Sequence, residues 1–326
     1  MKHARTAKKA HLILALSITA FLSSSCSKDD DDNGGQPNTI ANVVSNTSDF
    51  STLNAAIGRS TLGNTLAGAG PFTVFAPDNT AFTASGISQS VLNSLTPQQT
   101  TTILQYHTLP GSIASSAVPA GPNARVSTVS GDSVFVTRNA NGVFVNGIRV
   151  TQADVAATNG VIHRIGRVLL PPAGNLVQSV AANTGASALV PLDSLNKAVG
   201  RVAAANPTLA SALTTNIFTV FAPTNAAFTQ LLQALGLTDI NQIPINTLQS
   251  VLTLHVVPGR VFSSDLANGS VGTVNGANIT VALTGGANGG PAVRGNGNGG
   301  SNANVTATNI MARNGVVHII DRVLLP

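Results

Sequence analysis

Four histidines beyond residue 38 are the residues that could transfer protons or bind a metal ion. His107 and His255 lie in matching stretches, LQYHTLPG and LTLHVVPG. His163 and His318 lie in a second matching pair, NGVIHRIGRVLLP and NGVVHIIDRVLLP. The two histidines of each half of the chain could form an acid–base couple or supply two ligands of a metal site.

The carboxylates that such chemistry needs do not repeat with the histidines. Asp78 of the first half is replaced by Thr224 in the second, and Asp154 is replaced by Asn309. One interpretation is therefore a hydrolase that uses a His–Asp pair in the first half only. The other is that each imidazole is buried and holds loop or strand backbone by hydrogen bonds. The chain lacks G-x-S-x-G, Walker and H-E-x-x-H motifs, so we predict no catalytic residue, no metal site and no cofactor.

The elements that must position these histidines are organised around a stretch that occurs twice. Residues 72–82 read FTVFAPDNTAF, and residues 218–228 read FTVFAPTNAAF. The β-prone run with large apolar groups on both faces predicts a fully buried strand, which should end at the proline. Asp78 or Asn79 can cap the helix expected to follow, and Thr224, which replaces Asp78 in the second copy, also has a side-chain oxygen that can do so. Strand, proline stop and capped helix are thus predicted in both halves.

Helices and strands are predicted on either side of this unit in the first half. Ile40, Val43 and Val44 have helical spacing, and 96–99 (TPQQ) has the residues of a capping box with proline at the first helical position. That helix should end near Tyr106 and His107. Further on, Asn141-Gly142 predicts a hairpin turn, and residues 161–170 predict a closing strand.

Three ordered motifs in each half make the chain similar to a known family. They are FTVFAP-x-N-x-AF, the histidine before LPG or VPG, and NGV-[IV]-H…VLLP. The chain resembles the fasciclin-like (FAS1) domain family. The resemblance implies an α+β fold, with each domain a wedge or sandwich of β-strands packed with several helices, and a role in surface adhesion and matrix interaction. The family's Tyr-His pair is present as Tyr106-His107 but becomes Leu254-His255 in the second copy.

The repeats and the composition divide the chain into five segments. These are a signal peptide (1–25), an anchor cysteine with an acidic flexible tether (26–38), a first FAS1-like domain (39–171), a linker (172–175) and a second FAS1-like domain (176–326).

The first 38 residues predict export and membrane attachment. A basic start is followed by the apolar run 12–22, which is too short to span a bilayer. Cys26, the only cysteine, follows directly and resembles the lipid-attachment site of a bacterial lipoprotein. The alternative is ordinary cleavage that leaves a free thiol. We expect a chain that is secreted across the inner membrane and held by its lipid at the outer membrane or cell surface.

The composition excludes one class of partner. From residue 33 onward the chain has 12 Lys and Arg and 8 Asp, and this small net positive charge is too low for a nucleic-acid-binding surface. We expect an adhesion or matrix-interaction protein that binds a protein or polysaccharide, with a ligand- or glycan-binding accessory lipoprotein as the alternative. Residues 284–304 are rich in glycine and predict an enlarged, mobile loop, with Arg294 as its only charge. This loop could be a tolerated insertion or a binding loop.

Overall fold

The structure, a computed structural model, describes residues 38–121, 123–184, 190–286 and 289–326. Residues Pro37–Pro326 form one compact unit. The expected signal peptide, Cys26 and nearly all of the tether lie outside the described residues. Within the described part of the chain, no helix is both long enough and apolar enough to cross a membrane.

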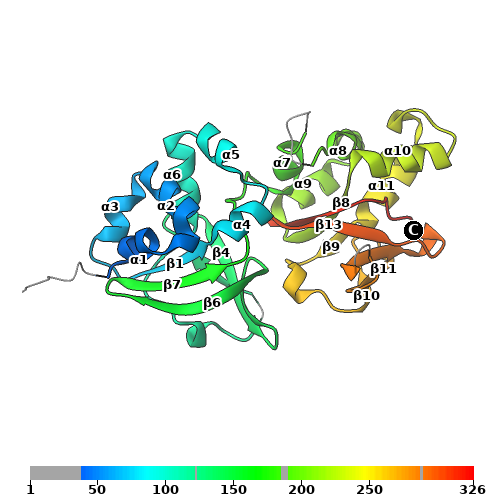
Figure 1. Cartoon of the computed structure of the whole chain (residues 1–326). Coiled ribbons are helices and arrows are strands. Elements are labelled where there is room, and N and C mark those ends of the chain that lie inside the picture. The colour runs from blue at the N-terminus through cyan, green and yellow to red at the C-terminus, as the bar shows by residue number, and fades with distance from the viewer. Residues whose placement is uncertain (1–37, 122, 185–189, 287–288) are drawn as a thin grey trace, which may run out of the picture. The chain divides into compact units, whose positions relative to one another are not determined.

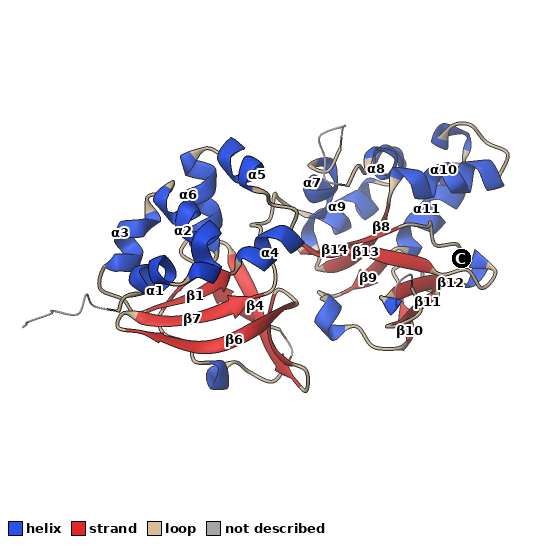
Figure 2. Cartoon of the chain, viewed as in Figure 1, coloured by secondary structure: helices blue, strands red, loops and turns tan. Residues whose placement is uncertain are grey.

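The first domain contains a seven-stranded sheet in the order β2-β1-β7-β6-β5-β4-β3, with helices gathered on one side of β1 and β7 (Figures 1 and 2). Its main helices are α1 (Ile40–Asn46), α2 (Ser51–Gly58), α3 (Leu62–Ala67), α4 (Asn79–Ala84), α5 (Gln89–Ser94) and α6 (Pro97–Tyr106). Its strands are β1 (Phe72–Pro77), β2 (Thr108–Pro110), β3 (Ala124–Ser127), β4 (Ser133–Asn139), β5 (Gly142–Val145), β6 (Ile148–Ala157) and β7 (Gly160–Ile165).

The second domain has the same plan, with strand order β10-β11-β12-β13-β14-β8-β9. Its main helices are α7 (Leu176–Ala181), α8 (Asp193–Ala205), α9 (Pro207–Thr215), α10 (Asn225–Ala234) and α11 (Ile245–Leu254). Its strands are β8 (Phe218–Pro223), β9 (Val256–Pro258), β10 (Gly269–Gly272), β11 (Asn278–Ala282), β12 (Ala292–Gly295), β13 (Ala303–Ala312) and β14 (Gly315–Ile320). The expected α+β fold of two tandem domains is confirmed.

The repeated stretch forms the second strand from one edge of each sheet, and both of its faces are apolar. Strand β1 pairs parallel with β7, and β8 pairs parallel with β14. Val74 and Ala76 of β1 pack with the helices, whereas Phe75 packs with the core on the opposite face of the sheet. The predicted strand that ends at proline is present in both copies, which end at Pro77 and Pro223. Burial is less complete than predicted, because Phe72, Phe218 and Val220 are half-buried.

The helix caps follow from the same stretch. Asp78 Oδ1 accepts a hydrogen bond of 2.8 Å from the backbone N–H of Ala81, and Thr224 Oγ1 accepts one of 3.2 Å from that of Ala227. The predicted capping box that begins helix α6 at Thr96 is also present. Each cap satisfies a backbone donor that has no partner within the helix.

Two strand boundaries differ from the sequence prediction. The β4–β5 turn consists of residues 140–141, and Gly142 is the first residue of β5 with a positive φ of 124°. The closing strand ends at Ile165 and does not continue to residue 170. Beyond it, the backbone N–H groups of Val168 and Leu169 donate to the side chains of Ser85 and His107, which replace the sheet as hydrogen-bond partners.

The prediction that 284–304 is one enlarged, mobile loop is wrong for residues 292–295 and 303–304, which are in strands. This stretch contains β12, which pairs with both β11 and β13 inside the sheet. Its short side chains are the reason, because Ala292 and Val293 can be buried in a closely packed layer. Gly295 has its Cα against the carbonyl oxygen of Leu325, where a Cβ would lie only 2.2 Å away. The glycines therefore admit the last residues of the chain and do not loosen the backbone.

Candidate functional site

His107 and His255 each join the end of a helix to the segment that follows the last strand of their domain. Nδ1 of His107 lies 2.8 Å from the carbonyl oxygen of Ile103, and its Nε2 accepts a hydrogen bond of 2.9 Å from the N–H of Leu169. His255 makes the same two bonds, at 2.7 Å to Val251 and 2.9 Å from Leu324. Since a backbone N–H can only donate, Nε2 must be the unprotonated nitrogen.

Burial decides the charge of these two rings. Both imidazoles are buried among apolar residues, which lowers the pKa of His107 and of His255 to about 4. The hydrogen bond to a backbone carbonyl opposes this shift but is the smaller effect. The rings are therefore neutral near pH 7, and both nitrogens of each are engaged by the domain's own backbone.

His163 and His318 occupy a second repeated position, on the last strand of each sheet. Nε2 of His163 lies 2.8 Å from the carbonyl oxygen of Ile113, and Nε2 of His318 lies 2.9 Å from that of Val261. Burial lowers the pKa of His318 to about 4. Nδ1 of each ring accepts a backbone N–H from the preceding strand, at 3.2 Å in the first domain and 3.4 Å in the second.

The backbone donors to these rings are Asp154 and Asn309, which have the left-handed φ angles of 59° and 63°. The Asp154 carboxylate accepts hydrogen bonds from the backbone N–H of Ser115, at 2.8 Å, and from its hydroxyl. These bonds lower the pKa of Asp154. In the second domain the Asn309 amide accepts from the N–H of Ser263 at 2.8 Å and donates to its hydroxyl at 2.8 Å. An amide thus replaces the carboxylate in the same structural role.

The first domain therefore does bring a serine, an aspartate and a histidine together. Their hydrogen bonds differ from those of a nucleophilic relay, in which the imidazole accepts the serine proton and the carboxylate orients the imidazole. Here the Ser115 hydroxyl donates to Asp154, and both nitrogens of His163 bond to backbone groups. This arrangement can hold strand β6, at Asp154, against the segment that begins at Ile113.

A metal site is not formed by these residues. Across the residues that the structure describes, no group of three or more His, Cys, Asp or Glu side chains is placed to hold a metal ion.

Comparison with known proteins identifies the repeated fold. The fasciclin domain model matches residues 48–171 and 193–326. The chain belongs to the fasciclin domain family. Among its relatives, protein sll1483 of Synechocystis sp. is 40% identical over 136 residues, which cover 41% of this chain and 74% of that protein.

Other relatives match over a similar length. Transforming growth factor-beta-induced protein ig-h3 of Sus scrofa is 36% identical over 135 residues, or 41% of this chain and 20% of that protein. Immunogenic protein MPB70 of Mycobacterium bovis is 34% identical over 142 residues, which cover 41% of this chain and 69% of that protein. A FAS1 domain pair from the insect cell adhesion molecule fasciclin I superposes with a TM-score of 0.39 and 20% identity, covering 85% of this chain and 97% of that one.

Tyr106 explains why the two fasciclin domains differ beside their first histidine. Its hydroxyl donates to the carbonyl oxygen of Ser133 at 3.1 Å and accepts from Nδ2 of Asn146 at 3.0 Å. Asn146 and Gly147 both have positive φ and form the tight turn between β5 and β6. The corresponding connection of the second domain, between β12 and β13, is longer, and there Leu254 lies buried in an apolar cluster.

The same turn lies where the two fasciclin domains contact each other. A Cβ at Gly147 would lie 2.6 Å from Cβ of Phe262, so glycine is required for this approach. The Phe262 and Phe135 rings pack with centroids 6.1 Å apart, and the Arg260 guanidinium lies 4.2 Å from the centroid of Phe135. Asn146, Arg260 and Phe262 were not among the site residues predicted from the sequence, although the Asn-Gly dipeptide was a recognisable turn signal.

Arg294, the predicted charge of a binding loop, lies on strand β12 opposite Thr280. It is half-buried, and its Nη1 donates to the carbonyl oxygen of Gly300 at 3.3 Å. This guanidinium therefore helps to fold the connection between β12 and β13.

Proposed function

We propose that this chain is an adhesion or matrix-interaction protein of the cell surface and that it acts without catalysis. The observation that carries the proposal is how the candidate catalytic side chains are bonded. The four histidines, and Asp154 with its counterpart Asn309, bond to the backbone of their own fasciclin domain. Such a framework presents its loops and outer strands as the surfaces for recognition.

We further propose that Cys26 carries a lipid and that the acidic tether holds the domains away from an outer-membrane or cell-surface bilayer. The support is in the sequence, where the single cysteine follows an apolar run and precedes an acidic segment. The partner would be a protein or a polysaccharide, because the net positive charge of the domains is too low to bind a nucleic acid.

The anchor and the adhesion can be tested together. Cells that produce the natural chain, a Cys26→Ala variant or a Ser25→Ala control are compared for adhesion to a coated surface and for membrane fractionation. We expect Cys26→Ala to be released from membranes as folded protein and its cells to lose adhesion, with Ser25→Ala unchanged. Membrane retention of Cys26→Ala would refute the anchor. If cells that produce the natural chain adhere no better than cells that lack it, the proposed function is refuted.

The class of partner is tested by capture from an envelope extract. Immobilised protein is incubated with untreated, protease-treated or periodate-treated extract. Loss of the captured material after protease treatment identifies a protein partner, and loss after periodate treatment identifies a polysaccharide. Capture that equals the capture by a heat-unfolded sample would contradict a specific surface.

A further inference from the structure

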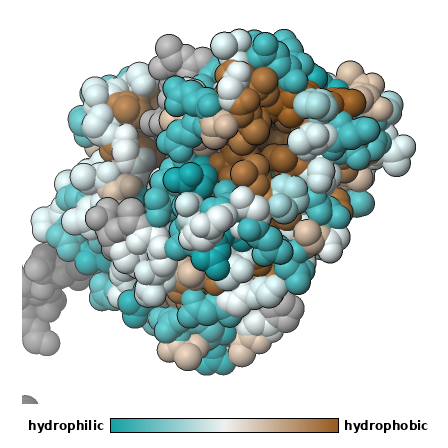
Figure 3. Space-filling model, turned by 90° about the vertical axis from the view of Figure 1, so that its right-hand side faces the viewer, coloured by the Kyte–Doolittle hydropathy of each residue, from teal (hydrophilic) through white to brown (hydrophobic). Residues whose placement is uncertain are grey.

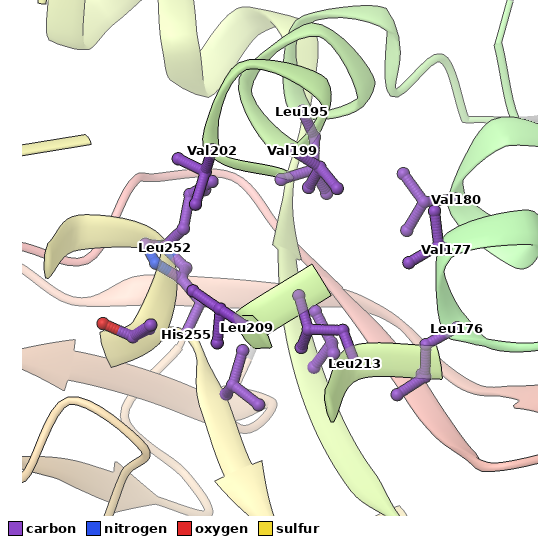
Figure 4. Close-up of a pocket in the computed structure, with 13 residues that line it drawn as sticks. Leu176, Val177, Val180, Leu195, Val199, Val202, Leu209, Leu213, Leu252 and His255 are labelled. Carbon is purple, nitrogen blue, oxygen red and sulfur yellow. The ribbon is translucent and has the colours of Figure 1, made fainter. Parts of the chain in front are cut away.

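The second domain contains an apolar groove between helices α7, α8, α9 and α11. Apolar residues gather in a depression on the face shown in Figure 3, and Figure 4 shows side chains from these helices directed into a shared space. The groove has a cavity volume of about 50 Å³ and reaches strand β8 at Val220. Of its 13 lining residues, all within the described part of the chain, Thr253 and His255 alone are polar.

The first domain provides an internal comparison, because equivalent positions can be assigned from equivalent hydrogen bonds. Asn159 Nδ2 donates to the carbonyl oxygen of Leu66, and Asn314 Nδ2 donates to that of Leu213. Helices α3 and α9 therefore correspond. In the same way, Asn79 and Asn225 receive equivalent backbone bonds at the starts of α2 and α8.

The side chains at equivalent positions are buried in the first domain and partly exposed in the second. Four apolar side chains of the first domain are buried, with 8% or less of their surface exposed, and their counterparts in the groove are half-buried. The pairs are Ile57 and Val199, Leu62 and Leu209, Leu66 and Leu213, and Val74 and Val220. The cause lies in the helices: α8 has 13 residues where α2 has 8, and α9 contributes no fully buried residue.

We propose that this groove binds the methyl end of one fatty acid, as a single unbranched chain. The walls offer apolar contacts and no charged side chain among the described lining residues. Both nitrogens of His255 are already engaged. A peptide strand would find few partners for its backbone groups, which are costly to bury unpaired.

The size of the groove supports the same occupant. A volume of about 50 Å³ suits the end of a narrow chain, since a single water needs roughly 10–15 Å³. A second copy of the chain would need to bury about 800 Å² on each partner to form a stable dimer. A diacyl lipid would leave its second chain in water. The fatty acid carboxylate stays in solvent, outside the groove.

The test is fluorescence of cis-parinaric acid, which increases on transfer to an apolar site, and its displacement by saturated fatty acids of increasing length. We expect affinity to rise about fourfold for each added methylene until the groove is full, from the usual transfer energy of a methylene. Val199→Phe and Leu213→Phe should fill the groove and weaken binding at least tenfold. Leu235→Phe is the matched control, because Leu235 is 53% exposed and lies outside the groove.

Melting temperatures are measured for each variant, and Leu209→Gln replaces a filling variant that fails to fold. Equal binding by the filled variants and the Leu235→Phe control would overturn the proposal. So would binding to phospholipid vesicles without binding to monomeric fatty acid. A dimer in sedimentation that Val199→Phe dissociates, with no parinaric acid binding, would assign the groove to a second copy instead. None of these results depends on adhesion or on Cys26.

Discussion

The Tyr106 hydroxyl oxygen lies 3.0 Å from the Asn146 side-chain nitrogen, and both residues are almost completely buried. Asn146 also accepts the N–H of Phe135 at 2.8 Å through its Oδ1. One asparagine therefore connects helix α6, strand β4 and the turn that faces the second domain. Burial raises the pKa of Tyr106 to about 12, so its hydroxyl remains a donor at any ordinary pH.

Removing this pair should destabilise the first domain. Tyr106→Phe leaves the Asn146 amide without its acceptor, and Asn146→Ala also loses the bond to Phe135. We expect each variant to lower the free energy of unfolding by about 1–3 kcal/mol. A double-mutant cycle in urea should give a coupling of about 1 kcal/mol. The exposed turn variant Asn141→Ala is the control, and additive losses would show that the bond contributes nothing.

Acid should weaken the fold in a defined pH window. The imidazoles of His107, His255 and His318 have an ordinary pKa of 6.5, which burial lowers to about 4 in the folded chain. Between these values the unfolded chain binds more protons, so stability is complete above about pH 6.5 and falls until about pH 4. The loss is on the order of 3 kcal/mol for each ring.

Thermal melting at a series of pH values measures this effect. We expect His107→Gln to lower the melting temperature at pH 7 but to reduce its dependence on pH between 7 and 4. The pKa of the Asp154 carboxylate is lowered from 3.8 by its bonds to Ser115, so this group titrates below the histidine window. An unchanged slope in His107→Gln would show that this ring does not control acid stability.

Asp154→Asn should be nearly neutral for stability, because Asn309 makes equivalent bonds to Ser263 with the same backbone conformation. We expect a change below about 1 kcal/mol. Asp154→Ala should cost about 1–3 kcal/mol, since alanine cannot bond to Ser115 and tolerates a positive φ poorly. Urea unfolding measures both. A large loss in Asp154→Asn would mean that the negative charge itself is required.

Gly295→Ala should disturb the packing of the last residues of the chain. Its added Cβ would lie 2.2 Å from the carbonyl oxygen of Leu325, a backbone atom that cannot turn aside. We expect a loss of about 1–3 kcal/mol, as for other overpacked sites. Gly200→Ala in helix α8 meets nothing within 4 Å and should stabilise by about 0.5–1 kcal/mol. Equal melting temperatures for both variants would refute this account of the glycine-rich stretch.

Local patterns in the sequence were sufficient for the elements that depend on neighbouring residues. The buried strand at Phe72, its proline stop, the Asp78 cap and the Thr96 capping box all follow from the types of adjacent residues. The burial of the histidines was also predictable, because each copy lies between apolar residues in a repeated motif.

Features that depend on distant contacts could not be predicted in this way. The glycine-rich composition of 284–304 indicated a loop, yet β12 lies there because β11 and β13 provide partners on both sides. Nothing local to Asn146 shows that Tyr106 will reach it from helix α6, 40 residues earlier. The groove likewise arises from the length of α8, whose effect on α9 is visible only by comparison with the first domain.

The parallel pairing of β8 with β14 has a consequence for the order in which the second domain can form. Phe218 lies beside Gly315 and Phe221 beside His318, so β8 can complete its parallel pairing only after a partner is synthesised nearly a whole domain later. The apolar face of β8 therefore stays uncovered in a nascent chain until β14 is available. Such long-range pairing slows folding, and until β14 is available the uncovered face of β8 exposes the chain to aggregation.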